Sequence, residues 1–179
     1  MQNQPETFLV ELILYNNWAN AQVLAACQKL SEEQLAASAP GAYGSIFATL
    51  VHMIIAEADY VGRVTGQMPM PPFQRGDDIS VADLAAFNQK VGQALLDVVQ
   101  RTPLTDIVHE EEESLFLDYE SRLLFMQAVI HGIEHRTNVT TIINSLGITL
   151  PELDGWGYLF AHPQAFALKE GSLQEDKAE

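Results

Sequence analysis

The sequence carries four long stretches in which apolar residues recur every three or four positions, the spacing of amphipathic helices. Helix-capping or helix-breaking residues mark their ends: Ser45 can cap the second, Pro103 ends the third, and Gly147 followed by Pro151 stops the fourth. The stretches run over about 6–30, 45–66, 80–102 and 119–146. Four amphipathic helices of roughly 20 to 28 residues predict an all-α fold, a four-helix bundle.

The segments between these helices are irregular and differ in length. Residues 67–78 are rich in proline and are expected to form a loop. Residues 105–119 show no helical period and predict short extended pieces or an irregular excursion. After Pro151 comes a short aromatic segment with room for one helical turn. We expect residues 1–168 to form one domain and 169–179 a polar tail, while the order in which the helices pack stays open.

Charge and composition narrow the classes of partner. The 179 residues include 24 acidic and 9 basic ones, a net charge of −15, without a cluster of Lys and Arg. Nucleic acid and anionic membrane surfaces are bound by such clusters, so neither is expected as a partner. No apolar run reaches the roughly 18 residues that span a bilayer, and the first residues lack the pattern of an export signal. We therefore expect a cytoplasmic protein.

Two histidines lie four residues apart in the stretch "QAVIHGIEHRTN" of the fourth helix. On a helix, His131 and His135 point about 40° apart and lie about 6 Å apart along the axis, so both can reach one metal ion. They fall on an apolar stripe of the kind that a bundle helix turns to its core: Leu124, Ala128, His131, His135, Val139, Ile142 and Leu146. Neutral imidazoles in a core need either hydrogen-bond partners or a metal ion. These two residues alone leave both interpretations open.

His52 is a third histidine in a similar setting. It lies in "SIFATLVHMIIAEADY", the most apolar of the four helices, on a face of small residues. In a bundle, one side chain of one helix can meet two side chains of another. Three histidines around a divalent ion leave at least one coordination position open, which is the pattern of catalytic rather than structural metal sites.

Three segments together resemble the DinB-like (YfiT-like) metalloenzyme superfamily: "YNNWANAQVL" in the first helix, "LVHMIIAEADYV" in the second and "AVIHGIEHRTNVTTIINSLG" in the fourth. "PELDGWGY" is similar to a segment that follows the last helix in one branch of it. The resemblance covers about residues 6–160 and implies a four-helix bundle that binds a divalent metal through His52, His131 and His135. Many members continue the His-Arg pair with Gly-Gln, whereas this chain has Thr137-Asn138, so no role of Gly-Gln carries over.

The resemblance also implies an activity. Similar proteins of known activity use the metal with a low-molecular-weight thiol, which they transfer to an electrophile or isomerise as an adduct. We therefore expect a transferase-like enzyme with a small-molecule substrate, in which the metal lowers the pKa of a thiol or of water and makes it the nucleophile. Zinc and nickel both suit three imidazoles. Asp59, Gln127 and Asn138 are the candidates for residues of the surrounding pocket.

Two other functions fit part of the pattern. His131-Gly-Ile-Glu134-His135 also matches His-x-x-Glu-His, in which Glu134 would be the general base of a metal-dependent hydrolase. Little chain follows the fourth helix to build a peptide-binding cleft, so a solvated Glu134 is the preferred interpretation. The other alternative is a metal-binding or stress-related dimer without catalytic activity.

Several further residues are expected to have structural roles. Tyr15 and Trp18 predict core or pocket wall, because large aromatics at helical spacing are usually packed. Glu57 points about 140° away from the histidine of its helix and is expected to pair helices. His109 and His162 lie outside the helical stripes and are expected at the surface.

The aromatic segment near the end of the chain has two interpretations. Trp156, Tyr158 and Phe160 either cap the mouth of the bundle or form a contact between two copies of the chain. A homodimer is expected because similar proteins commonly pair.

Overall fold

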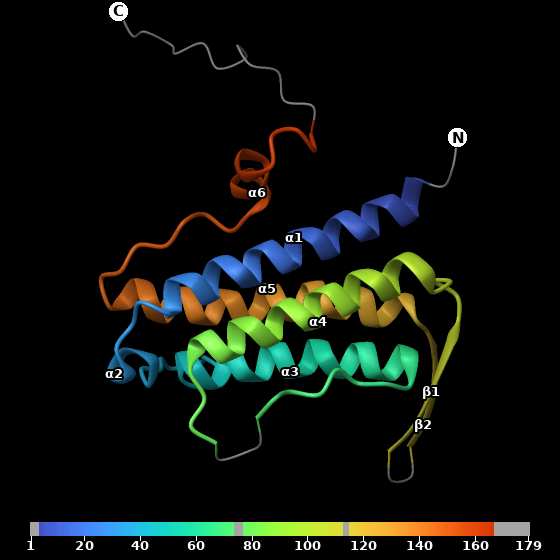
Figure 1. Cartoon of the computed structure of the whole chain (residues 1–179), viewed down its shortest axis with the longest axis horizontal. Helices are drawn as coiled ribbons and strands as arrows, with labels where there is room; N and C mark the ends of the chain where they lie inside the picture. Colours follow the sequence, from blue (N-terminus) through green and yellow to red (C-terminus); the bar gives the residue numbers. More distant parts are fainter. Residues whose placement is uncertain (1–3, 74–76, 113–114, 167–179) are drawn as a thin grey trace, which may run out of the picture.

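The computed structural model of the chain describes residues 4–73, 77–112 and 115–166, and its four long helices form one bundle (Figure 1). These helices are α1 (Gln4–Cys27), α3 (Ile46–Thr65), α4 (Val81–Arg101) and α5 (Arg122–Ser145). Helices α1 and α3 each pack against both α4 and α5, so the four helices form a ring. The prediction of an all-α four-helix bundle is confirmed, and the structure adds the packing order.

The core lies inside the ring and takes side chains from all four long helices. Ile13, Leu50, Phe87 and Phe125, one from each helix, are at most 1% exposed. Burial of each such side chain contributes roughly 1.5–3 kcal/mol relative to leaving it in water. Among the described residues, we find no helix with the length and apolar character needed to cross a membrane.

The ends of α3 and α4 follow capping residues in the sequence. The Ser45 hydroxyl accepts a hydrogen bond from the Ala48 amide at the start of α3, and Gly66 ends that helix with a φ of 75°. Left-handed backbone of this kind favours glycine, which has no Cβ. Helix α4 begins with a capping box, in which the side chains of Ser80 and Asp83 each accept from the other's backbone amide.

Helix α1 ends at Cys27, three residues before the expected position, because the chain tightens there. The amides of Lys29 and Leu30 bond to carbonyls only three residues back. Ser31 then caps a short helix, α2 (Glu32–Leu35), that the sequence analysis did not predict. A helix of four residues is too short for apolar periodicity to reveal it.

A β-hairpin connects α4 to α5. Strand β1 (Ile107–Glu112) pairs antiparallel with strand β2 (Leu115–Glu120), which confirms the extended pieces predicted within 105–119. Helix α5 begins at Arg122 rather than near Tyr119, because the last residues of β2 still pair with β1.

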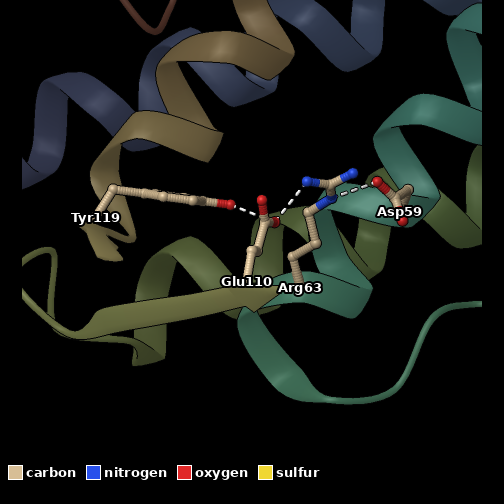
Figure 2. A network of polar contacts seen from close by, with 4 residues as sticks. All are labelled: Asp59, Arg63, Glu110 and Tyr119. Atoms are coloured by element: carbon tan, nitrogen blue, oxygen red, sulfur yellow. Dashed lines mark hydrogen bonds and ion pairs between the residues drawn. The ribbon is translucent and has the colours of Figure 1, made fainter. Parts of the chain in front are cut away.

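Polar contacts hold the hairpin against the C-terminal end of α3 (Figure 2). Arg63 of α3 donates hydrogen bonds both to Asp59, one turn earlier, and to Glu110 of β1. The hydroxyl of Tyr119 on β2 donates to the same Glu110 carboxylate. These groups are partly exposed, so the contacts orient the hairpin more than they stabilise the fold.

A last short helix, α6 (Gly155–Ala161), lies against α1 (Figure 1). Tyr158 is 6% exposed and packs on Trp18 of α1, with ring centroids 5.3 Å apart. Trp156 and Phe160 remain 68% and 59% exposed. Of the three aromatic rings in this segment, Tyr158 thus packs on α1, while those of Trp156 and Phe160 are exposed to solvent. The predicted polar tail 169–179 lies outside the described residues.

Candidate metal centre

Three histidines from two helices meet at the seam between α3 and α5. His52 lies in the first half of α3, and His131 and His135 lie about one turn apart on α5. The Nε2 atom of His131 lies 3.1 Å from that of His52 and 3.0 Å from that of His135. One ligand nitrogen from each histidine lies within 4.8 Å of the other two, which makes a group that could hold a metal ion. The structure thus brings together the three histidines that the sequence analysis singled out.

The contacts of His131 show why these residues fit a cation. An imidazole nitrogen carries either one hydrogen or one lone pair, so Nε2 of His131 cannot make good hydrogen bonds to both neighbours. A divalent cation between the rings can accept all three lone pairs. Zinc with nitrogen ligands at about 2.0–2.1 Å and tetrahedral angles separates those nitrogens by about 3.3 Å, close to the two distances observed. The residues present therefore suit a divalent metal.

Burial lowers the pKa of all three imidazoles. It lowers the pKa of His131 to about 4, and repulsion by His135 and His52 in their charged forms acts in the same direction. The pKa values of His52 and His135 are also lowered, chiefly by burial. The imidazoles are therefore neutral near pH 7, the form in which histidine binds metals.

The centre lies at the edge of the core and not in its middle. His135 is 6% exposed, whereas His52 and His131 are partly exposed. This corrects the expectation that the whole α5 stripe faces the core; Leu146, the last residue of that stripe, is 40% exposed. One side of the centre is therefore open to a ligand from solvent.

Two tyrosines that the sequence analysis did not single out pack against the imidazoles. Tyr43, in the loop before α3, stacks on His52 with centroids 4.1 Å apart and planes at 16°, and also contacts His135 at 5.1 Å. Tyr60 of α3 packs against His131 at 6.0 Å. Within the described residues, Nδ1 of His131 and of His135 is buried and has no hydrogen-bond partner, so ring contacts orient these imidazoles. Of these two tyrosines, only Tyr60 could have been predicted from the sequence. It comes eight residues after His52 on the same helix, so the two side chains point about 80° apart.

The three predicted pocket residues have different surroundings. Gln127 lies close enough to the Tyr60 hydroxyl to act against the rise in the pKa of that group, a rise caused mainly by burial, and so is near a residue of the centre. Asn138 donates its side-chain amide to the backbone carbonyl four residues earlier, at 2.8 Å. Asp59 instead binds Arg63, on the side of α3 that meets the hairpin (Figure 2).

The remaining candidates lie apart from the centre. Glu134 is exposed on α5, in agreement with the interpretation of a solvated carboxylate. His109 is exposed on the hairpin and pairs with Asp118 at 2.7 Å. His162 was expected at the surface, but it is partly buried, with its ring 4.4 Å from that of Tyr158.

We compared the sequence and the structure of this chain with those of known proteins. A sequence model of the DinB family matches residues 1–172. The chain belongs to the DinB family. Among solved structures, this DinB-family chain is similar to the crystal structure of a DinB-like protein from Bacillus cereus ATCC 10987, with a TM-score of 0.62 and 19% sequence identity, over 80% of this chain and 94% of that chain. At this identity the similarity supports the fold alone. No curated protein matches the sequence.

Proposed function

We propose that this DinB-family protein is a metal-dependent enzyme that activates a small nucleophile, with His52, His131 and His135 as the metal ligands. The observation that carries the proposal is the convergence of three neutral imidazoles. Nε2 of His131 lies 3.1 Å from Nε2 of His52 and 3.0 Å from Nε2 of His135. Bound there, a divalent ion such as zinc or nickel would lower the pKa of a thiol or water beside it and so supply a nucleophile near pH 7.

The residues around the centre suit this role. Burial keeps the imidazoles neutral, so no proton has to leave before the ion binds. The ring of Tyr43 covers one face of His52 and reaches His135. The partial exposure of His52 and His131 leaves a side through which a small molecule can approach.

A low-molecular-weight thiol is the proposed co-substrate, and the support for it is resemblance to other DinB-like proteins. In the transfer, the thiolate sulfur forms a bond to the carbon of a small electrophile, and the leaving group departs with the electron pair of the broken bond. The hydrolase alternative assigns Glu134 as general base; its exposed position favours thiol transfer over that alternative.

Metal content is the first test of the proposal. We expect about one zinc or nickel ion per chain in purified protein by elemental analysis, lost in His131→Ala because this residue contacts both other ligands. His109→Ala is the matched control, since it removes an exposed histidine outside the centre. Metal-free wild-type protein that also fails to take up either ion in solution would contradict the proposal.

The second test separates an enzyme from a metal-binding protein without catalysis. Metal-loaded protein is incubated with bacillithiol, mycothiol or glutathione and an activated aryl chloride, and the release of chloride is followed. We expect turnover with at least one thiol and none in His131→Ala. Protein that holds its metal but turns over none of the three thiols would contradict thiol transfer and favour the non-catalytic alternative.

We also propose that the protein forms a homodimer through the outer face of α5, and that it works in the cytoplasm. Four apolar side chains along this face are between 42% and 51% exposed: Leu123, Met126, Ile130 and Ile133. Their alternating spacing of three and four residues is that of a helix-packing seam. A seam of uncharged residues is complementary to its own copy across a two-fold axis, which supports a second copy as the partner.

The homodimer is tested by the mass of the protein in solution. Ile130→Glu places a charge on the seam and is expected to change the mass in light scattering from two chains to one. Leu117→Glu is the control, because this residue is similarly exposed but lies on the hairpin. A wild-type protein with the mass of one chain at micromolar concentration would rule out the dimer.

A further inference from the structure

A second polar cluster joins the same helices as the histidines, but inside the bundle. It consists of Asn16 and Asn20 on α1, Glu57 on α3 and Arg136 on α5, and each of these residues is at most 3% exposed. We call it the amide bridge. Four buried polar side chains in the core of one small bundle are costly unless their groups are paired.

Two side-chain amides carry the connection. Oε1 of Glu57 accepts hydrogen bonds from Nδ2 of Asn16 at 2.8 Å and from Nδ2 of Asn20 at 2.9 Å. Nη1 of Arg136 donates to Oδ1 of Asn16 at 2.7 Å and to Oδ1 of Asn20 at 2.6 Å. Each asparagine thus donates to the carboxylate and accepts from the guanidinium, so the charges on α3 and α5 are joined through α1.

The amide bridge and the histidines fix the same two helices. Arg136 directly follows His135 on α5, and Glu57 comes five residues after His52 on α3. A side-chain atom lies roughly 5–6 Å from its helix axis, so rotating α5 by about 10° would move an imidazole nitrogen by about 1 Å. Metal–ligand distances tolerate only about 0.2 Å. The rotation of α3 and α5 about their axes therefore has to be fixed by something other than the histidines.

Gly132 shows how closely α5 approaches α1 at this point. A Cβ at this position would lie 2.5 Å from Oδ1 of Asn16 and 2.7 Å from Nη1 of Arg136, both atoms of the amide bridge. Both distances are too short for real contacts. A side chain at residue 132, which lies directly after His131, would displace the hydrogen bonds of the bridge.

We propose that Asn16, Asn20, Glu57 and Arg136 are positioning residues for the three-histidine centre, a role that rests on the proposed metal function. The bridge fixes the rotation of α3 and α5, and so sets the distances between His52, His131 and His135. Helix α1, which supplies no metal ligand, thereby becomes part of the site. This gives Asn16 and Asn20, two of the three asparagines of "YNNWANAQVL", a function that the motif alone did not reveal.

The experiment uses a variant that keeps the fold while removing the bridge. Replacing a buried ion pair by apolar residues of similar size is often neutral or stabilising, so Glu57→Leu combined with Arg136→Met is expected to fold. Its stability is expected to be lower than that of wild type, because Asn16 and Asn20 stay buried and lose these hydrogen-bond partners. Co²⁺ is titrated into metal-free protein, and its visible absorption reports both affinity and coordination geometry. We expect a dissociation constant about 10–100-fold higher than in wild type and an altered spectrum.

Two further variants separate positioning from stability. Val91→Ala removes an apolar side chain from the core on α4, a helix that supplies no histidine to the centre and meets the bridge through a long contact, from Nδ2 of Asn20 to Oδ1 of Asn88 at 3.5 Å. It is expected to lower stability while Co²⁺ affinity stays within about twofold. Gly132→Ala keeps every polar group but displaces the ends of two flexible side chains, and is expected to weaken Co²⁺ binding in the same direction as the double variant.

The outcomes are distinct. A double variant and a Gly132→Ala variant that both bind Co²⁺ with wild-type affinity and spectrum would overturn the positioning role alone. Wild-type protein that binds no Co²⁺ would overturn the metal centre and this role with it. If the double variant does not fold, the affinity and spectrum of Gly132→Ala decide the question.

Discussion

Two polar clusters join α3 to α5, and they differ in how their atoms are satisfied. In the amide bridge, donors meet acceptors: two asparagines receive hydrogen bonds from Arg136 and give them to Glu57 at 2.6–2.9 Å. Within the described residues, the second oxygen of Glu57, Oε2, and the second terminal nitrogen of Arg136, Nη2, are buried without a hydrogen-bond partner. In the histidine centre, three like nitrogens face one another, and only one of the two short contacts can be a good hydrogen bond. A complementary cluster holds helices together by itself, whereas a cluster of like groups is completed by a ligand.

The largest expected effect breaks the amide bridge on one side only. Arg136→Ala leaves Glu57 buried without its cation and is expected to lower the free energy of unfolding by about 3–5 kcal/mol. His131→Ala in metal-free protein is expected to change it by less than about 1 kcal/mol, because it removes one of three crowded nitrogens. Urea unfolding followed by circular dichroism measures both. Equal losses in the two variants would show that the clusters do not differ in this way.

A metal ion is expected to stabilise the second cluster and not the first. Zn²⁺ at about 100 times its dissociation constant should raise the free energy of unfolding of wild-type protein by about 2.7 kcal/mol, since only the folded centre binds it. Urea unfolding with Zn²⁺ and with EDTA gives the difference, and His131→Ala should show none. An unchanged Zn²⁺ effect in that variant would mean that the ion binds elsewhere, such as at the acidic hairpin.

The sequence predicted these two clusters unequally. Apolar periodicity located the long helices, and the family motifs pointed to all three histidines. The amide bridge was missed because its hydrogen bonds join residues 41 and 120 positions apart, and periodicity shows which face a residue occupies but not what it meets there. Predicting the bridge would have required the order in which the helices pack, because it is this order that brings α1 against α5.

Tyr43 was missed for another reason. Its ring contacts two of the histidines, but it lies in the irregular segment between α2 and α3, where no repeat predicts the direction of a side chain. Glu57 was assigned a helix-pairing role from its angle alone, and the structure supplies its partners on α1. Local patterns thus identified groups that need a partner, while tertiary packing decided which partner each received.

The two clusters should also respond to pH in opposite directions. The pKa of His131 is about 4 in the folded protein and about 6.5 when unfolded, so between these values the unfolded chain binds a proton that the folded chain does not. Stability of metal-free protein therefore falls as pH drops through this window. Burial raises the pKa of Glu57, so this carboxyl contributes stability that is lost as pH rises above its unfolded value.

Variants separate these two contributions to the pH dependence. Between pH 7 and pH 5, in EDTA, His131→Ala should lose less stability than wild type, as measured by urea midpoints, and Glu57→Gln should lose at least as much. Val91→Ala, which removes no titratable group, should show the same pH dependence as wild type at its lower overall stability. A pH dependence in His131→Ala identical to that of wild type would show that this imidazole does not titrate as inferred.

The smallest expected effect concerns Tyr43, the aromatic ring that covers one side of the histidine centre. The amide bridge needs no such cover, because its four residues are buried. Tyr43 is 57% exposed although its ring stacks on His52, so it shields the centre only from one side. Tyr43→Ala should raise the Co²⁺ dissociation constant a few-fold, by freeing His52 to rotate, and Tyr43→Phe should restore it because the contact is made by the ring. Phe160→Ala, which removes an aromatic ring of similar exposure on α6, is the control. Loss of affinity in Tyr43→Phe as great as in Tyr43→Ala would instead assign the effect to the hydroxyl, and the tyrosine would then act on the ligand rather than on the imidazole.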